Sequence, residues 1–394
     1  MQRILILLAS VGIQLALGGV YAWSAFVPAL RADHELTGWQ AGLIFGTTIS
    51  VFTITMLLAG RRLDRVGPRR MAMLAALVYG GGYLLAGSTS GEWPWLWLGI
   101  GVFTGIGIGM GYVCPLTTCV RWYPDRKGMV TGIAVAGFGG GAMILAEVVE
   151  LLVTAGWSPL RIFRMLGWVL AGFVMLCASV LRFPGPAPEQ APPPRGAALW
   201  RDPRFLRLFM GMFGGTFGGL LVIGHLKPIA LVAELSSQAG AFAVSAFALG
   251  NAAGRIAWGT LYDRYGYRVV TISMAFLSFS LIGLLDTGVA WRFIGASLVA
   301  GFGFGACFVV YAAEVASTFG VGQVGRLYPK VFLAYGVAGI AGPFLGGWLY
   351  DLTNGYFWPV CTAVLVSGLG AVTTAVGRRR AMASPIPTGP ADLR

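Results

Sequence analysis

Long apolar runs recur from one end of this sequence to the other, and they limit what the chain can fold into more than any other feature. Several runs reach, without a charged residue, the roughly 20 residues that a helix needs to cross a bilayer. Charged residues make up 11% of the chain and hydrophobic residues 57%, whereas a soluble globular domain carries about 25% charged residues. A soluble domain is therefore excluded, and we predict an all-α membrane protein.

The number of spans follows from the polar segments that separate the apolar runs. Twelve spans with short connections would take about 33 residues each, which suits a chain of 394 residues. The first run follows a single arginine, Arg3, and carries no small-residue cleavage site, so we expect it to be retained as a span. The twelve predicted spans cover residues 4–30, 39–60, 71–88, 96–120, 128–152, 162–182, 204–232, 240–261, 268–286, 292–318, 327–349 and 357–377.

The net charge of +13 is carried by short basic clusters between the apolar runs, not by one face of a helix. Such clusters are orientation signals, because Lys and Arg accumulate in cytoplasmic loops. They predict a lipid bilayer rather than a nucleic acid as the partner, and a multi-pass protein of the inner (plasma) membrane with both termini in the cytoplasm. The loops predicted to be cytoplasmic hold Arg61, Arg62, Arg65, Arg69 and Arg70; Arg121, Arg126 and Lys127; Arg195, Arg201 and Arg204; Arg264 and Arg268; and Arg378, Arg379 and Arg380, whereas the other loops hold little more than Arg31, Arg161 and Arg292.

The two halves of the chain resemble each other at a spacing of about 200 residues. Three matches carry this repeat: GRRLDRVG at 60–67 with GTLYDRYG at 259–266, the alternate glycines of 105–109 with those of 301–305, and Pro28 with Pro228. Matches at nearly one offset indicate duplicated halves packed about a pseudo-twofold axis. A substrate site is then expected near the midplane, between the halves.

A proline-rich segment, PGPAPEQAPPPRGAALWRDP, divides the chain nearly in half. Its composition is typical of a semi-rigid or disordered linker. The predicted divisions are a six-helix bundle at 1–183, a cytoplasmic linker at 184–203, a second six-helix bundle at 204–377 and a cytoplasmic tail at 378–394.

The loop between the second and third predicted spans has the pattern Gly-x-x-x-Asp-Arg-x-Gly-x-Arg-Arg. This pattern resembles the signature of the major facilitator superfamily, and it implies that family's fold of twelve transmembrane helices in two pseudo-twofold halves. Glycine permits close helix approach, and an aspartate can cap or pair across a helix end, so the loop is a candidate conformational latch. A tight turn with cytoplasmic arginines is the alternative. The latch candidates are Gly60, Asp64, Arg65, Gly67 and Arg69, with Asp263 and Arg264 in the repeat.

Three further motifs resemble the oxalate/formate antiporter family, a branch close to the monocarboxylate transporters. They are the aromatic GVYAWS at 19–24, the arginine-bearing NAAGR at 251–255 and the glycine-rich FLAYGVAGIAGP at 332–343. In the branch that carries dicarboxylates, a second cation is expected in the eleventh helix. This sequence has Tyr335 there, with Lys330 about five residues earlier near the cytoplasmic mouth. The departure favours a monocarboxylate over a dianion such as oxalate.

Arg255 lies near the centre of the eighth predicted span, with no acidic residue within one or two turns. Inserting a charge at that depth costs roughly 2.5–3.5 kcal/mol of free energy on insertion scales, so a charged residue there is expected to have a function. Its planar fork suits a carboxylate held through two parallel hydrogen bonds. Asn251, four residues earlier, lies on the same helix face and can orient the guanidinium. The alternative is a structural ion pair with an acid from another helix, such as Glu314.

Two residues are candidates for proton coupling. His225 precedes Pro228 in the seventh span, where proline frees a backbone carbonyl and often marks a bend, and a histidine titrates near physiological pH. Since the neighbouring Lys227 can snorkel to the outer interface, His225 is alternatively an interfacial residue. Glu314 in the tenth span is the second candidate, with a structural ion pair or helix-end charge as its alternative.

Two other acids, Glu147 and Glu150, fall near the outer end of the fifth span. We expect both of them to be interfacial.

Aromatic side chains complete the predicted substrate pocket. Each offers an apolar face for a short carbon chain, and each tyrosine adds a hydroxyl for an oxyanion. Ordinary packing is the alternative for any one of them. The set comprises Tyr21, Trp23, Tyr112, Tyr311 and Tyr335.

The sequence shows no hydrolase-like triad, nucleotide motif or metal-ligand spacing, and its five cysteines lie in apolar runs without a CxxC pair. We therefore predict no enzyme, cofactor or metal. The leading interpretation is a secondary transporter of a small monocarboxylate of lactate, pyruvate or formate size, working by alternating access. Its coupling is to protons or to exchange against another anion, and the expected form is a monomer.

Three alternatives stay open. An exchanger of oxalate/formate-type anions is one, and an exporter of apolar drugs with the same fold is another, in which Arg255 forms a structural pair. A non-transporting membrane sensor is the third, but it would need a sizeable cytoplasmic domain or partner-binding tail, and residues 378–394 are short and featureless.

Overall fold

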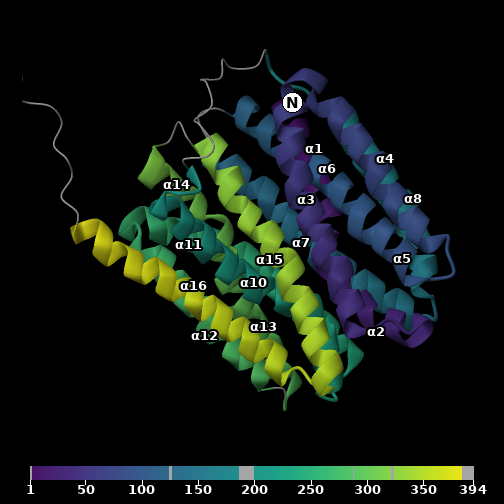
Figure 1. The fold of residues 1–394 in the computed structure, drawn as a ribbon. Helices are drawn as coiled ribbons and strands as arrows, with labels where there is room; N and C mark the ends of the chain where they lie inside the picture. The colour runs from purple at the N-terminus through teal and green to yellow at the C-terminus, as the bar shows by residue number, and fades with distance from the viewer. Residues whose placement is uncertain (1, 124–126, 186–198, 287, 321–323, 384–394) are drawn as a thin grey trace, which may run out of the picture.

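The computed structural model describes residues 2–123, 127–185, 199–286, 288–320 and 324–383. Within these residues every regular element is a helix, and no strand is present. The prediction of an all-α fold is therefore confirmed, and the helices run up and down the molecule as a bundle (Figure 1).

The described part of the first half folds into six long helical stretches, two of which are built from three consecutive elements. One stretch passes from α1 through a short 3-10 helix, η1, into α2, and another passes from α5 through a π-helix, η2, into α6. The elements are α1 (Gln2–Gly18), η1 (Gly19–Ala22), α2 (Trp23–His34), α3 (Gly38–Val66), α4 (Pro68–Gly87), α5 (Trp93–Leu96), η2 (Trp97–Thr104), α6 (Gly105–Trp122), α7 (Lys127–Thr154) and α8 (Pro159–Ser179).

The described part of the second half also folds into six stretches. The 3-10 helix η5 interrupts one of them between α13 and α14. The elements are α10 (Pro203–Val232), α11 (Ser237–Tyr265), α12 (Arg268–Ile282), η4 (Gly283–Leu285), α13 (Ala290–Gly305), η5 (Ala306–Phe308), α14 (Val310–Phe319), α15 (Val324–Thr353) and α16 (Phe357–Ala383).

Eleven of the described stretches are long and apolar enough to cross a membrane, judged by length and composition alone. The remaining stretch, α11, has 29 residues and is therefore long enough to cross a membrane, but it does not meet the criterion for apolar composition. It is less apolar because it carries Asn251 and Arg255 at mid-length. Among the described stretches, the one that is not apolar enough to count as a span is thus the one that bears the charge predicted to be functional.

The sequence motif that occurs in both halves, at 60–67 and 259–266, forms the same kind of turn at the end of a helix in each half. Gly67 has a φ of +84° and Gly266 a φ of +60°, a region that favours glycine. The Gly67 amide donates to the Leu63 carbonyl at 2.8 Å, and the Gly266 amide donates to the Tyr262 carbonyl at 2.7 Å. Both α3 and α11 therefore end in the same way at the same place in the repeat.

The two halves meet along α3 and α15, which pack side by side (Figure 1). A Cβ atom at Gly42 would lie 2.1 Å from the Pro343 carbonyl oxygen, and one at Gly46 would lie 2.5 Å from that of Gly339. Both distances are far below van der Waals contact, so the two helices approach this closely only because these residues are glycine. The pairs α7–α11 and α2–α10 complete the interface.

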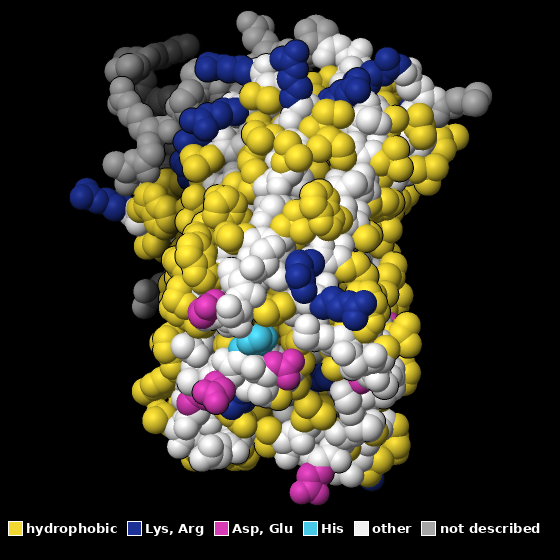
Figure 2. Space-filling model, turned by 90° about the vertical axis from the view of Figure 1, so that its right-hand side faces the viewer, with side chains coloured by type: hydrophobic (Ala, Val, Ile, Leu, Met, Phe, Trp, Pro, Cys, Tyr) yellow, Lys and Arg dark blue, Asp and Glu magenta, His cyan; other side chains and the backbone are white. Residues whose placement is uncertain are grey.

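The two ends of the bundle differ in charge. We call the end where α2 stops and α3 begins the α2–α3 end, at the bottom of Figure 1, and the opposite end, where α8 stops and α10 begins, the linker end. Figure 2 shows Lys and Arg side chains gathered at the linker end, above a broad apolar surface. Leu77, Trp168 and Leu176 are among the large apolar side chains exposed on α4 and α8, as expected where a protein faces lipid.

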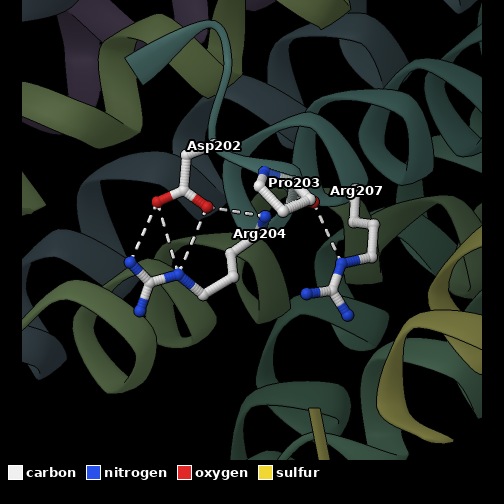
Figure 3. Close-up of polar contacts among 4 residues, drawn as sticks. All are labelled: Asp202, Pro203, Arg204 and Arg207. Carbon is white, nitrogen blue, oxygen red and sulfur yellow. Dashed lines mark hydrogen bonds and ion pairs between the residues drawn. The ribbon is translucent and has the colours of Figure 1, made fainter. Parts of the chain in front are cut away.

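The start of α10 is capped where the chain leaves the predicted linker, of which residues 186–198 lie outside the described residues. The Asp202 carboxylate accepts a hydrogen bond from the Arg204 amide at 2.8 Å and pairs with the Arg204 guanidinium at 2.9 Å (Figure 3). Arg207 donates to the Pro203 carbonyl at 3.0 Å. The hydrogen bonds from Arg204 hold the pKa of the Asp202 carboxyl below its usual value, so this cap is present throughout the neutral range.

Candidate functional site

The first span is interrupted at mid-length by η1, and this interruption positions Tyr21. The Tyr21 side chain is buried, and its hydroxyl lies 2.7 Å from the Tyr335 hydroxyl of α15. Either hydroxyl can donate this hydrogen bond. The bond joins the first half of the chain to the second, at the depth where the sequence predicts the substrate site.

Arg255 extends from α11 into the same region. Its Nε donates to the Asn251 side-chain oxygen at 3.3 Å, one turn away on the same helix. The guanidinium carbon lies 4.4 Å from the ring centre of Phe308, a cation–π contact. Its Nη1 atom is buried and has no hydrogen-bond partner among the described residues. Asn251 thus orients the guanidinium, and Nη1 is left without a partner among the described residues.

No carboxylate of the described residues forms an ion pair with Arg255. The ion pairs found there join Arg121 with Asp64, Arg204 with Asp202, Lys227 with Glu150 and Arg292 with Asp286. The two oxygens of Glu314, the partner considered from the sequence, accept instead from the hydroxyls of Tyr262 and Thr318, each at 2.6 Å. Glu314 therefore connects α14 to α11 near the linker end and leaves Arg255 unpaired.

Tyrosines from both halves surround the guanidinium. Tyr112 comes from α6, and Tyr328 comes from α15, where its hydroxyl donates to the Phe308 carbonyl at 3.1 Å. The sequence did not single out Tyr328, because it lies beside Lys330 in a segment predicted to be the cytoplasmic mouth. The hydroxyls within electrostatic reach of the Arg255 charge are those of Tyr21, Tyr112, Tyr328 and Tyr335.

Phenylalanines fill the space between these tyrosines. The Phe138 ring of α7 stands edge-on to Tyr21 and Tyr112, with ring centres 5.6 and 5.3 Å apart. A phenylalanine in an apolar run is as compatible with a position that faces lipid as with one that faces the interior of the protein. The sequence alone therefore could not identify these residues as part of the site. We call the following set the aromatic cage: Phe52, Phe138, Phe304, Phe308 and Phe332 with Tyr21, Tyr112, Tyr328 and Tyr335.

Two predicted pocket residues point to other neighbours. The Trp23 indole donates to the Ala41 carbonyl of α3 at 3.1 Å, inside the first half. The Tyr311 hydroxyl lies against Gly211 of α10 and has no hydrogen-bond partner among the described residues. The structure therefore brings together Arg255, Asn251 and three of the predicted tyrosines, and places Trp23 and Tyr311 beside them in the helix packing.

His225 is buried near the α2–α3 end of α10. Its Nδ1 lies 2.8 Å from the Leu221 carbonyl, and its ring centre lies 5.6 Å from that of Tyr356. A carbonyl can only accept, so Nδ1 carries a proton. The Nε2 atom is buried without a hydrogen-bond partner among the described residues. The proton role of His225 stays a prediction.

Lys227 does not snorkel to the surface, so the alternative in which it reaches the outer interface does not hold. Its side chain is only 2% exposed, and its ammonium pairs with the Glu150 carboxylate of α7, which is 5% exposed. The expectation that Glu150 is interfacial is wrong for the same reason. Both predictions considered each helix by itself, whereas α7 and α10 turn these two charges toward each other across the interface between the halves.

The predicted latch residues lie at the linker end. Asp64 of α3 pairs with Arg121 of α6, and the Arg121 guanidinium lies 3.9 Å from the ring centre of Phe183. These contacts stay within the first half. Arg65 and Arg69 are exposed. The conformational role of this loop stays a prediction.

The family of the chain follows from comparison with known sequences. The family model described as Major Facilitator Superfamily matches residues 7–266 and 222–391. This chain belongs to the major facilitator superfamily. It is a multi-pass membrane transporter and not an enzyme, as the sequence predicts.

Individual relatives confirm the predicted branch of the superfamily. The uncharacterized MFS-type transporter YhjX of Escherichia coli is 28% identical over 351 residues, 86% of each chain. The oxalate:formate antiporter of Oxalobacter formigenes is 26% identical, over 89% of this chain and 84% of the relative. Monocarboxylate transporter 11 of Mus musculus is 27% identical, over 64% of this chain and 60% of the relative.

Solved structures confirm the fold. A bacterial homolog of the human lysosomal transporter Spinster, in an inward-facing and unoccupied conformation, superposes with a TM-score of 0.76. The superposition covers 98% of this chain and 99% of that one, at 14% sequence identity. At that identity the likeness concerns the fold alone.

Proposed function

We propose that this protein is a secondary active transporter that binds a small monocarboxylate at Arg255. The observation that carries the proposal is the half-buried Arg255, whose buried Nη1 has no hydrogen-bond partner and which has no carboxylate partner among the described residues. A buried unpaired charge is costly, so a transporter is expected to retain one only where its substrate supplies the counter-charge. The fork then binds both carboxylate oxygens through parallel hydrogen bonds.

The aromatic cage argues for a small substrate with a short carbon chain. The Tyr21–Tyr335 hydrogen bond bridges the two halves within electrostatic reach of the guanidinium, and phenylalanine rings supply apolar surface around the two tyrosines. Tyr335 stands where a dicarboxylate carrier would place a second cation. One cation and several hydroxyls balance one carboxylate, which favours substrates of lactate, pyruvate or formate size.

Exchange of oxalate/formate-type anions is a second candidate, because the relative from Oxalobacter formigenes is named an oxalate:formate antiporter. Export of apolar drugs is less favoured, since that alternative requires Arg255 in a structural ion pair. We also propose that the protein lies in the plasma membrane, with the linker end and both termini on the cytoplasmic side.

The direct test is uptake of radiolabelled lactate, pyruvate, formate and oxalate into proteoliposomes, with and without a pH gradient. We expect uptake of a monocarboxylate, and a loss of at least tenfold in Arg255→Lys, because lysine keeps the charge but not the two-point fork. Uptake that responds to the pH gradient indicates proton coupling. Uptake that depends on internal anion and ignores the gradient indicates exchange.

Arg292→Lys is the matched control, because Arg292 at the start of α13 forms an exposed ion pair with Asp286, which follows η4. Its uptake should equal that of the parent. Parental uptake in both Arg255→Lys and Arg255→Ala would refute the carboxylate site.

A further inference from the structure

Two arginines lie on the outer surface of α8, close to its start at the α2–α3 end. Arg161 and Arg164 are both exposed and stand three residues apart, so they share one face of the helix. Figure 2 looks onto the side of the molecule where α4 and α8 lie, and it shows a small group of Lys and Arg side chains within the apolar surface, apart from the linker end. Basic residues collect at the linker end as orientation signals, so a pair at the opposite end needs another explanation.

Neither of these guanidiniums has an acidic partner. The Arg161 guanidinium carbon lies 3.8 Å from the ring centre of Trp157, which precedes the helix. The Arg164 side chain lies against α4, where a Cβ atom at Gly87 would come within 2.7 Å of its Cγ. Among the described residues, neither arginine belongs to an ion pair. The two side chains are therefore placed by apolar contacts, and their positive charges remain available to a ligand.

The start of α8 adds to the positive potential. The helix has 21 residues, and its aligned peptide groups give this end a partial positive charge. Acids at the same end of the molecule do not neutralise it, because Asp33, Glu35 and Glu92 are exposed without an ion pair among the described residues. The local field therefore favours an anion.

The surface further along α8 is apolar. Trp168, one turn past Arg164, is 72% exposed, and Leu176 is 69% exposed. Gly172 lies between them on the same face, and a Cβ atom there would meet nothing within 4 Å. This face thus combines two cations at its start with apolar side chains and free space beyond them.

We propose that this face of α8 binds an anionic phospholipid, such as phosphatidylglycerol, from the leaflet at the α2–α3 end. The phosphodiester oxygens accept hydrogen bonds from the guanidiniums of Arg161 and Arg164. One acyl chain lies against Trp168 and fills the space at Gly172. The apolar surface selects a lipid over a free phosphate. The absence of an ammonium selects an anionic headgroup over a zwitterionic one, because an ammonium would be repelled by the second arginine.

The test measures lipid contact at α8 directly and needs no substrate. In a chain whose own cysteines are replaced, the fluorophore nitrobenzoxadiazole is attached to a cysteine at Val169, which is 56% exposed. Phosphatidylcholine nanodiscs receive increasing amounts of phosphatidylglycerol with a nitroxide on its acyl chain, which quenches the fluorophore at short range. The reference label is at Phe279 of α12, which is 77% exposed. We expect half-maximal quenching at Val169 at an about fivefold lower mole fraction than at Phe279.

Three variants assign this preference to the two arginines. Arg161→Gln with Arg164→Gln should raise the half-quenching mole fraction at Val169 to that of the reference label. Arg161→Lys with Arg164→Lys should keep most of the preference, because an ammonium still attracts a phosphate. Arg292→Gln is the matched control and should behave as the parent. Arg292 is an exposed arginine beside a tryptophan at the same end, but it already pairs with Asp286.

Three results would overturn the proposal. One is equal quenching at Val169 and Phe279 in the parent, and another is a preference that survives in the double glutamine variant. The third is loss of the preference when inorganic phosphate is added at constant ionic strength, which would make the arginines a site for a free ion. Nitroxide-labelled phosphatidylcholine should quench both positions alike. These outcomes are independent of carboxylate uptake through Arg255, so the lipid site and the proposed transport function can fail separately.

Discussion

Two cations near the interface of the halves, the buried Lys227 and the half-buried Arg255, differ in how their charge is compensated. Lys227 is paired with Glu150 from the other half, whereas Arg255 has a helix neighbour, Asn251, and an aromatic ring but no acid among the described residues. A buried charge needs a counter-charge or several hydrogen bonds. The paired cation therefore fits a structural or gating role, and the unpaired one fits a ligand site.

At the residue scale, the Tyr21–Tyr335 hydrogen bond should matter for substrate binding. Replacing Tyr21 by Phe removes one hydroxyl and leaves the Tyr335 hydroxyl buried without its partner. A net loss of about 1 kcal/mol corresponds to about fivefold weaker apparent affinity, measured as the half-saturating concentration of monocarboxylate uptake. Since the two hydroxyls act as one pair, the double variant Tyr21→Phe/Tyr335→Phe should be no worse than either single variant.

Tyr356→Phe is the control for that prediction. The Tyr356 hydroxyl is buried and has no hydrogen-bond partner among the described residues, so its removal should leave uptake unchanged. Additive losses in the double variant would contradict the pairing of the two hydroxyls.

At the element scale, three spans depart from regular α-helix close to the aromatic cage. Tyr21 lies in η1, Phe308 in η5, and the π-helix η2 leads into α6, which carries Tyr112. A change of helix type alters the angle between successive side chains, and such interruptions are frequent at functional sites. Tyr21 and Phe308, which lie within two of these interruptions, are both members of the cage.

The close approach of α3 and α15 also makes a testable prediction. In Gly42→Ala the new methyl group would meet the Pro343 carbonyl oxygen at 2.1 Å, so the helices must separate. Overpacking of this kind costs about 1–3 kcal/mol. We expect a lower melting temperature in detergent, measured by tryptophan fluorescence, together with slower uptake.

Gly81→Ala serves as the matched control within a helix. A Cβ atom at Gly81 of α4 meets nothing within 4 Å, so alanine should leave the melting temperature unchanged or raise it through its better helix propensity. Equal melting temperatures for Gly42→Ala and the parent would show that the two helices tolerate a wider spacing.

At the scale of the whole molecule, the arginines at the linker end predict which side faces the cytoplasm. In a chain whose own cysteines are replaced, a cysteine at the exposed position Ala155 should react with a membrane-impermeant maleimide on intact cells. A cysteine at the exposed position Arg62 should react only after the cells are permeabilised. The opposite labelling pattern would reverse the predicted orientation.

The fold was largely predictable because its signals are local. A bilayer forces each apolar run into a helix that satisfies its own backbone, and the repeated turn at Gly67 and Gly266 shows where two such helices end. The site was predictable in part. The sequence predicted Arg255, Asn251, Tyr21, Tyr112 and Tyr335 because polar groups at mid-membrane are rare, whereas Phe138 and Phe308 belong to the most common kind of residue in such a chain, the apolar kind.

The sequence by itself determined that this chain crosses a membrane as helices in two related halves, and it predicted that Arg255 lies at mid-depth. Only the tertiary structure decided that Arg255 has no acid beside it, that Glu314 turns to Tyr262, and that Lys227 meets Glu150. The reason is that hydropathy acts on each segment alone. Pairing between helices depends instead on their rotation and relative depth, which are set by the packing of all of them together.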